Sequence, residues 1–202
     1  MSVLLRHSGS RRALIGLAFA LFASGCSSLG GGVPPTYDLT APSHFPGLRG
    51  ARGQLLVQDA SAIGVLDSDK IVVRPTIGEF AALTNAQWVE RLPRLVQVRL
   101  IQTFENARRN RAVGRPGERI AGDYQLVLDI RSFEIAASEG PLAEVIIGAK
   151  IVGDRSGRIV AGRVFSARVP TSATQGSAAV AALDAAWGRV AVDIVLWTSR
   201  II

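Results

Sequence analysis

Three long segments in the second half of the chain constrain its fold most. From Tyr124 to Ile130, apolar residues at every second position alternate with more polar ones, a period typical of a strand buried on one face. Further strand-like segments run from Leu142 to Val152 and from Arg158 to Val169, and the turn between them, residues 154–157, ends in a glycine that tolerates positive φ. Three consecutive long strands joined by short turns predict an antiparallel meander.

Two helices are expected around this meander. Leu92 to Ala107 repeats apolar residues with helical spacing, and Pro93 lies in the first turn, where its missing N–H has no cost. Ser177 to Thr198 carries a stripe of large apolar residues, and its opposite side, from Ala181 to Leu196, is also largely apolar. A helix that is apolar on two sides is usually buried on two sides. Either the domain alone buries both sides or a partner subunit covers one, and we slightly favour the partner, for which a homo-oligomer is a candidate.

Shorter strands precede the first helix. Leu55–Gln58 and Lys70–Pro75 are short β-branched runs, and Ile77–Leu83 is expected to pair with the second of them and to end before Trp88. We therefore predict one α+β domain over residues 51–202, with two layers: a mainly antiparallel sheet and two long helices packed on it.

The N-terminus has the features of an export signal. Arg6, Arg11 and Arg12 precede an apolar run of ten residues, Ala13 to Phe22. This run is too short to cross a bilayer, which needs about 20 residues, but it suits the core of a signal peptide covering residues 1–25. The segment that follows, Ala-Ser-Gly-Cys at residues 23–26, resembles the lipobox of bacterial lipoproteins, although a leucine is usual where Ala23 stands. The alternative is an ordinary secretory signal with an incidental cysteine.

Cys26 is the candidate lipid-attachment residue. It is the only cysteine in the chain, so an intrachain disulfide is excluded and modification would remove a lone thiol from an oxidising compartment. Bacterial lipoproteins carry a diacylglycerol and an N-acyl chain on this residue, and more than one chain is needed for stable anchoring. Residues 26–50 are expected to form the lipidated cysteine and a flexible tether rich in Gly, Ser and Pro. Ser27, which follows the cysteine, favours the outer membrane under the sorting rule of enteric bacteria.

Few residues offer catalytic chemistry. His44 is the only histidine after the predicted signal peptide, and with no second cysteine we expect no catalytic residue, no cofactor and no metal ligand. A buried pair of carboxylates in a cleft would be needed to suggest an enzyme. Eight arginines lie between Arg91 and Arg119, which we interpret as a solvated surface, with anionic lipid or an acidic partner as the alternative. We expect no nucleic-acid partner, because no aromatic residues are interleaved with these arginines.

The order of several short motifs resembles a known family. They are Tyr37-Asp38-Leu39 soon after the cysteine, KIVVRP followed by Trp88-Val89-Glu90-Arg91-Leu92-Pro93, the strand from Asp123 to Ile130 continuing into Ser132-Phe133-Glu134, and Ala182 to Trp187 in a last helix that ends near Trp197. Together they resemble the ABC-type transport auxiliary lipoproteins of the paraquat-inducible protein C type.

This resemblance implies a function that composition does not show. It implies a lipoprotein on the periplasmic face of the cell envelope, anchored through Cys26 and expected at the outer membrane. There it would dock the MCE-domain protein of a lipid transport system whose ABC permease and ATPase lie in the inner membrane. ATP hydrolysis would belong to that partner complex, so the chain itself is expected not to be an enzyme. The alternative is a lipoprotein that itself binds a lipid or assists outer-membrane assembly.

Overall fold

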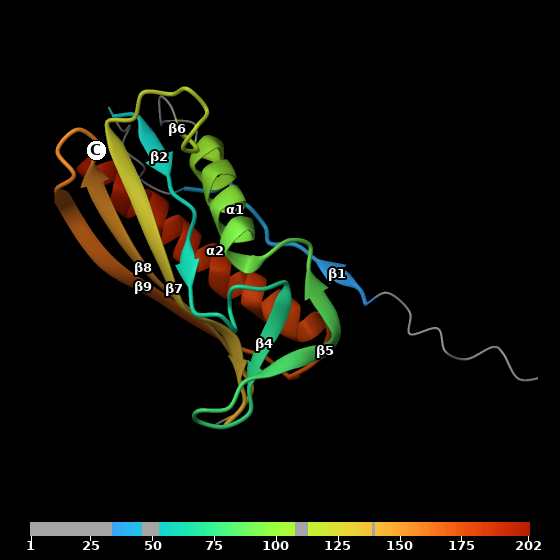
Figure 1. The fold of residues 1–202 in the computed structure, drawn as a ribbon. Coiled ribbons are helices and arrows are strands. Elements are labelled where there is room, and N and C mark those ends of the chain that lie inside the picture. Colours follow the sequence, from blue (N-terminus) through green and yellow to red (C-terminus); the bar gives the residue numbers. More distant parts are fainter. Residues whose placement is uncertain (1–33, 46–52, 108–112, 139) are drawn as a thin grey trace, which may run out of the picture. The chain divides into compact units, whose positions relative to one another are not determined.

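The computed structural model describes residues 34–45, 53–107, 113–138 and 140–202, which belong to one folded unit, Pro34–Ile202 (Figure 1). The predicted signal peptide and Cys26 lie outside the described residues. The unit begins N-terminal to the boundary that we predicted at residue 51. Thr36–Tyr37 form a strand and Leu39 is buried in the core, so part of the predicted tether is folded.

In the described part of the chain, strands precede α1, further strands follow it, and α2 comes last. The elements are β1 (Thr36–Tyr37), β2 (Leu55–Val57), β3 (Ser61–Ala62), β4 (Lys70–Arg74), β5 (Ala81–Trp88), α1 (Leu92–Asn106), β6 (Val113–Gly114), β7 (Tyr124–Ala136), β8 (Leu142–Gly153), β9 (Ile159–Pro170) and α2 (Gly176–Ile201).

The meander predicted in the second half is confirmed. β7 pairs antiparallel with β8, and β8 pairs antiparallel with β9 along almost its whole length. Gly157 in the turn between β8 and β9 has a φ of 63°, as its position in the predicted turn requires. On one face of these strands, Leu126, Ile147 and Phe165 point into the core, which accounts for the period of two.

The other edge of β7 corrects the predicted sheet. β2, β3 and β4 lie one after another along this edge, all parallel to β7. The fold is α+β as predicted, but its sheet is mixed rather than mainly antiparallel. Parallel pairing arises because β5 and α1 carry the chain back across the domain before β7 begins, and such a long crossover allows two strands to run in the same direction.

The β4–β5 hairpin also differs from the prediction. The expected pairing is present, since Val72 lies opposite Ala82, but the second strand begins at Ala81 rather than Ile77 and includes Trp88. The register shifts between Lys70 and Val72, and Asn85 has a φ of 55°. Because of this irregularity, the buried residues of β5 are Leu83, Ala86 and Trp88 rather than every second residue. A search for strict alternation therefore does not find this strand.

Both predicted helices are present. α1 keeps the predicted start and stripe, and α2 packs on β8 and β9 and beside α1 (Figure 1). Trp187 of α2 is fully buried, whereas Ala181 and Ala185 on the opposite side are exposed. The domain alone therefore does not bury that side, and a partner subunit there stays a prediction. No helix among the described residues has the length and apolar character needed to span a membrane.

Candidate functional site

The segment closest to the predicted anchor, residues 36–42, is fastened to β5 and both helices; we call it the N-terminal segment. Tyr37 pairs in parallel with Trp88 at the end of β5. Asp38 accepts hydrogen bonds from the guanidinium of Arg99 on α1, with Arg99 Nε 2.9 Å from Asp38 Oδ1 and a second contact to Asp38 Oδ2. A two-pronged contact of this kind fixes direction as well as distance.

The same segment is held to α2 by three further hydrogen bonds. The backbone N–H and the hydroxyl of Thr40 donate to the two carboxylate oxygens of Asp184, at 2.7 and 2.8 Å. The indole N–H of Trp187 donates to the carbonyl of Thr40 at 2.9 Å. The residue that follows the Tyr37-Asp38-Leu39 motif thus meets the motif from Ala182 to Trp187, and the chain enters the folded unit at a fixed place and in a fixed direction.

A second distinctive region is the turn at the tip of the β4–β5 hairpin, residues 76–80, which we call the hairpin tip. The N–H of Glu79 donates to the carbonyl of Thr76 at 3.2 Å, and Gly78 has a φ of 86°. A β-turn of this kind needs positive φ at its third position, which glycine allows. The side chain of Glu79 also accepts a hydrogen bond from the Thr76 hydroxyl at 3.1 Å. This turn presents Ile77 with 93% of its surface exposed.

The hairpin tip is tied to charged groups beneath it. The guanidinium carbon of Arg74 lies 5.5 Å from the centre of the Phe80 ring, a cation–π distance. Arg74 also forms an ion pair with Glu134 of β7, whose side chain is 1% exposed. The apolar residues of the tip are therefore supported by a contact that leads into the buried part of the sheet.

Glu134 belongs to a buried pair of carboxylates. Its neighbour across the β7–β8 pairing is Glu144, which is also buried, and the Ser132 hydroxyl lies within hydrogen-bond distance of both, at 2.9 and 3.3 Å. Arg168 of β9 donates to Glu144 at 2.6 Å. Each carboxylate thus has its own arginine, and neither lines the surface hollow at the start of β7 or the one on the open face of β7–β9. This arrangement neutralises buried charge and positions strands, as paired buried charges require.

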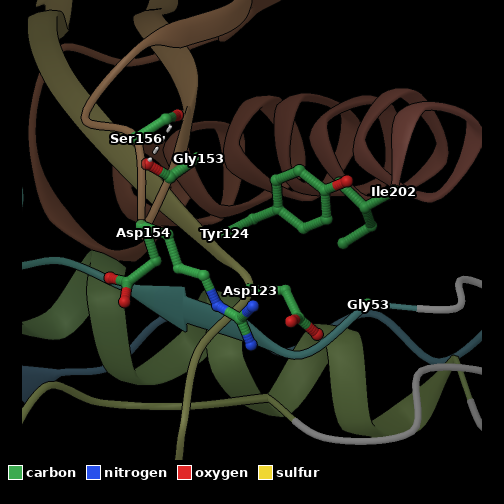
Figure 2. Close-up of a pocket in the computed structure, with 8 residues that line it drawn as sticks. Gly53, Asp123, Tyr124, Gly153, Asp154, Ser156 and Ile202 are labelled. Carbon is green, nitrogen blue, oxygen red and sulfur yellow. Dashed lines mark hydrogen bonds between the residues drawn. The ribbon is translucent and has the colours of Figure 1, made fainter.

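One surface hollow lies where β7 begins and β8 ends (Figure 2). It has a volume of about 460 Å³ and contains Asp123, Asp154 and Arg155. The carboxylates already have partners: the N–H of Gln54 donates to Asp123 at 2.9 Å, and the side-chain amide of Gln125 donates to Asp154 at 2.6 Å. Among the described residues no cluster of His, Cys, Asp and Glu side chains could hold a metal ion.

The structure separates the residues that the sequence singled out. Cys26 lies outside the described residues, as do Arg108, Arg109 and Arg111 of the arginine-rich run. His44 is exposed in a loop. Arg99, which belongs to the arginine-rich run, holds the N-terminal segment through Asp38.

Sequence reasoning missed the buried Glu134–Glu144 pair and its arginines. Their only signal was two glutamates among apolar residues of neighbouring long strands, which does not show that the two side chains meet.

Comparison with known proteins agrees with the fold and the motifs. An uncharacterised protein of Bradyrhizobium diazoefficiens is 34% identical over 173 residues, which are 84% of this chain, and the chain spans 47% of the length of that relative. A crystal structure of a Xanthomonas campestris protein of the DUF330 family is similar, with a TM-score of 0.72 and 31% identity, covering 83% of this chain and 93% of that one.

A second crystal structure, of an uncharacterised protein, shares only the fold: its TM-score is 0.63 at 14% identity, and the match covers 82% of this chain and all of that one. The sequence model of the ABC-type transport auxiliary lipoprotein component matches residues 37–195, from the N-terminal segment almost to the end of α2. The motifs that suggested this family include those that fasten the N-terminal segment to α2. The chain therefore belongs to the ABC-type transport auxiliary lipoprotein component family.

Proposed function

We propose that the protein is the docking component of an ABC/MCE-type lipid transport system. Lipid chains on Cys26 hold it on the periplasmic face of the outer membrane, and the folded unit binds the MCE-domain protein. ATP hydrolysis belongs to the partner permease and ATPase, and this chain is not an enzyme. Membership of the auxiliary lipoprotein family supports association with an ABC transporter; the MCE partner and the choice of membrane are our proposal.

The observation that carries the proposal is the hairpin tip. Ile77 is 93% exposed on a turn whose shape is fixed by Gly78 and by the Thr76–Glu79 hydrogen bonds. Burying such a side chain in an apolar pocket would contribute about 1.5–3 kcal/mol to the free energy of binding. The isolated domain does not gain this energy, because Ile77 faces solvent. Because the turn is already ordered, a partner with an apolar pocket would gain this energy with little entropic cost.

The packed core favours docking over the alternative of a lipid carrier. Trp88, Trp187, Phe104 and Phe133 are fully buried within one continuous apolar cluster, and Trp88 and Phe133 pack edge to face at 5.8 Å. An enclosed lipid chain would need apolar space of its own. The described part of the core instead uses large side chains to fill the space between its helices and its sheet.

The docking role is tested with Ile77→Asp in the intact lipoprotein. A charge at the hairpin tip opposes burial in an apolar pocket, so co-purification of the MCE-domain protein from detergent-solubilised envelopes should fall about tenfold or more. Ile63→Asp is the matched control, because Ile63 is also exposed, at 55%, but lies after β3 rather than at the tip. Equal recovery of the MCE-domain protein with both variants would refute docking through the hairpin tip.

Anchoring is tested separately with Cys26→Ala. Loss of the lipid chains should move the protein from the membrane fraction to the soluble periplasmic fraction, or leave an uncleaved precursor, as immunoblots of fractionated cells would show. The folded unit should keep its circular dichroism spectrum, since no described contact involves residue 26. A Cys26→Ala protein that stays in the outer membrane with its signal removed would contradict lipid anchoring.

A further inference from the structure

The face of β7–β9 that points away from α2 contains a second hollow, with a volume of about 480 Å³. We call it the sheet-face hollow. Cross-strand pairing sets its layout, since Val127 lies opposite Lys150 and Lys150 opposite Gly162, while Gly148 lies opposite Val164 two pairs further along, on the same face. The hollow therefore combines side chains from three neighbouring strands that the meander fixes in register.

Two glycines shape this hollow. A Cβ atom at Gly148 would lie 3.1 Å from the guanidinium of Arg131, so the arginine extends from β7 across β8 where the neighbouring strand has no side chain. A Cβ atom at Gly162 would lie 3.7 Å from Cγ of Lys150, which extends in the same way from β8 across β9. The glycines thus allow two cationic side chains to lie along the sheet rather than project from it.

The charge of the hollow is positive. Two cationic side chains line it, from Arg131 and Lys150, against one carboxylate, Asp129, a net charge of +1. Asp129 accepts a hydrogen bond from Arg131 Nε at 2.9 Å. No carboxylate in the described ranges forms an ion pair with Lys150. Arg163 also borders the hollow, but its guanidinium lies 5.0 Å from the centre of the Phe165 ring, on the side of β9 that faces the core. The ammonium group of Lys150 therefore remains for an anion from solution, beside the guanidinium of Arg131.

Apolar residues lie beside these cations. Val127 is half-buried, and Val164 keeps 49% of its surface exposed on β9. A ligand that satisfies both features has an anionic head that takes charge-assisted hydrogen bonds and a hydrocarbon part next to it. None of the lining residues is aromatic, so stacked nucleic-acid bases have no platform here.

We propose that the sheet-face hollow binds one anionic phospholipid, with its phosphate at Arg131 and Lys150 and its first methylene groups against Val127 and Val164. The occupant is a phospholipid rather than free phosphate, because phosphate alone would leave the valines exposed. The choice of a lipid as the ligand rests on the proposed role in lipid transport. Binding in the sheet-face hollow needs no contact through the hairpin tip. The protein would thereby hold a lipid at its surface as well as dock the conduit.

The test uses the intact lipoprotein purified in a mild detergent, with bound phospholipid counted by native mass spectrometry. Added phosphatidylglycerol should be retained at one molecule per chain and in preference to phosphatidylcholine, since the hollow has a net positive charge. Lys150→Glu should lower retention about tenfold. Arg200→Glu is the charge-matched control, because Arg200 is exposed at the end of α2, outside the hollow, and it should leave retention unchanged.

A second variant fills the hollow without changing its charge. Gly162→Val is sterically tolerated, because the nearest atoms to an added Cβ are at ordinary contact distance and valine favours strands. It should reduce phosphatidylglycerol retention about as much as Lys150→Glu while keeping the circular dichroism spectrum. Retention equal to wild type in both variants would overturn the proposal, and so would displacement of the lipid by inorganic phosphate at equal concentration, which would identify a free-anion site. Because no partner protein is present, loss of docking in the Ile77→Asp variant leaves this outcome unaffected.

Discussion

The N-terminal segment and the open face of β7–β9 use charged residues in opposite ways. In the N-terminal segment, Asp38 and Thr40 have partners from two helices, and Arg99 and Asp184 are occupied by these contacts. On the open face, Lys150 lies along the sheet with no carboxylate partner among the described residues. In the first region the polar groups hold the chain in place through hydrogen bonds, and in the second they remain available to a ligand.

This difference separates positioning from recognition. The contacts of Thr40 with α2 join residues more than 140 positions apart, so they form only when the whole unit is folded. Changes there should lower stability, whereas changes in the sheet-face hollow should leave stability almost unaltered and alter binding. Single substitutions in the two regions should therefore differ in their cost to the free energy of unfolding.

Truncation of Trp187 should have the largest effect on stability. Trp187 is fully buried and its indole N–H holds the carbonyl of Thr40, so Trp187→Ala creates a cavity and removes a hydrogen bond. The free energy of unfolding should fall by about 4 kcal/mol in urea denaturation. Val164→Ala on the open face should cost less than about 0.5 kcal/mol. Losses of similar size would remove the contrast between the two regions.

Neutralising Glu134 should have the next largest effect on stability. It compares a buried ion pair with an exposed one on the same face of the sheet. Glu134→Gln leaves Arg74 without its partner in a largely buried position, with an expected loss of about 3 kcal/mol. Asp129→Asn, at the open part of the same face, breaks a pair whose members are both about half exposed and should cost less than about 1 kcal/mol. Thermal unfolding of both variants measures the difference, and a reversed order would show that the burial of Glu134 does not make its ion pair the stronger one.

Replacing Asp184 should have the smallest effect of the three. Asp184→Asn weakens the two hydrogen bonds from Thr40 at a partly exposed position, so a loss of about 1 kcal/mol is expected. Hydrogen exchange of the Thr40 amide should become faster while exchange within β8 stays unchanged. Asp193→Asn on the same helix serves as the control, because Asp193 is exposed. Unchanged protection of Thr40 would mean that other contacts hold the N-terminal segment.

Much of the fold could be predicted because its patterns are local. Alternation gave the three strands of the meander, and helical spacing gave both helices to within a few residues. The hairpin tip could not be placed, because the irregularity around Asn85 breaks the alternation of β5. The start of the folded unit was also missed, since a segment rich in Pro and Gly gave no sign that Leu39 is buried.

Local sequence patterns predict the α+β class, the long meander, the two helices and the motifs of the family, because each depends on residues close together in the chain. Lipid attachment at Cys26 rests on the sequence alone and stays a prediction. The folded chain was needed to show that β2, β3 and β4 run parallel to β7, that Thr40 binds Asp184 and Trp187, and that Arg131 and Lys150 lie across glycines of neighbouring strands. These features join distant residues, and neither period nor composition specifies which distant residues meet.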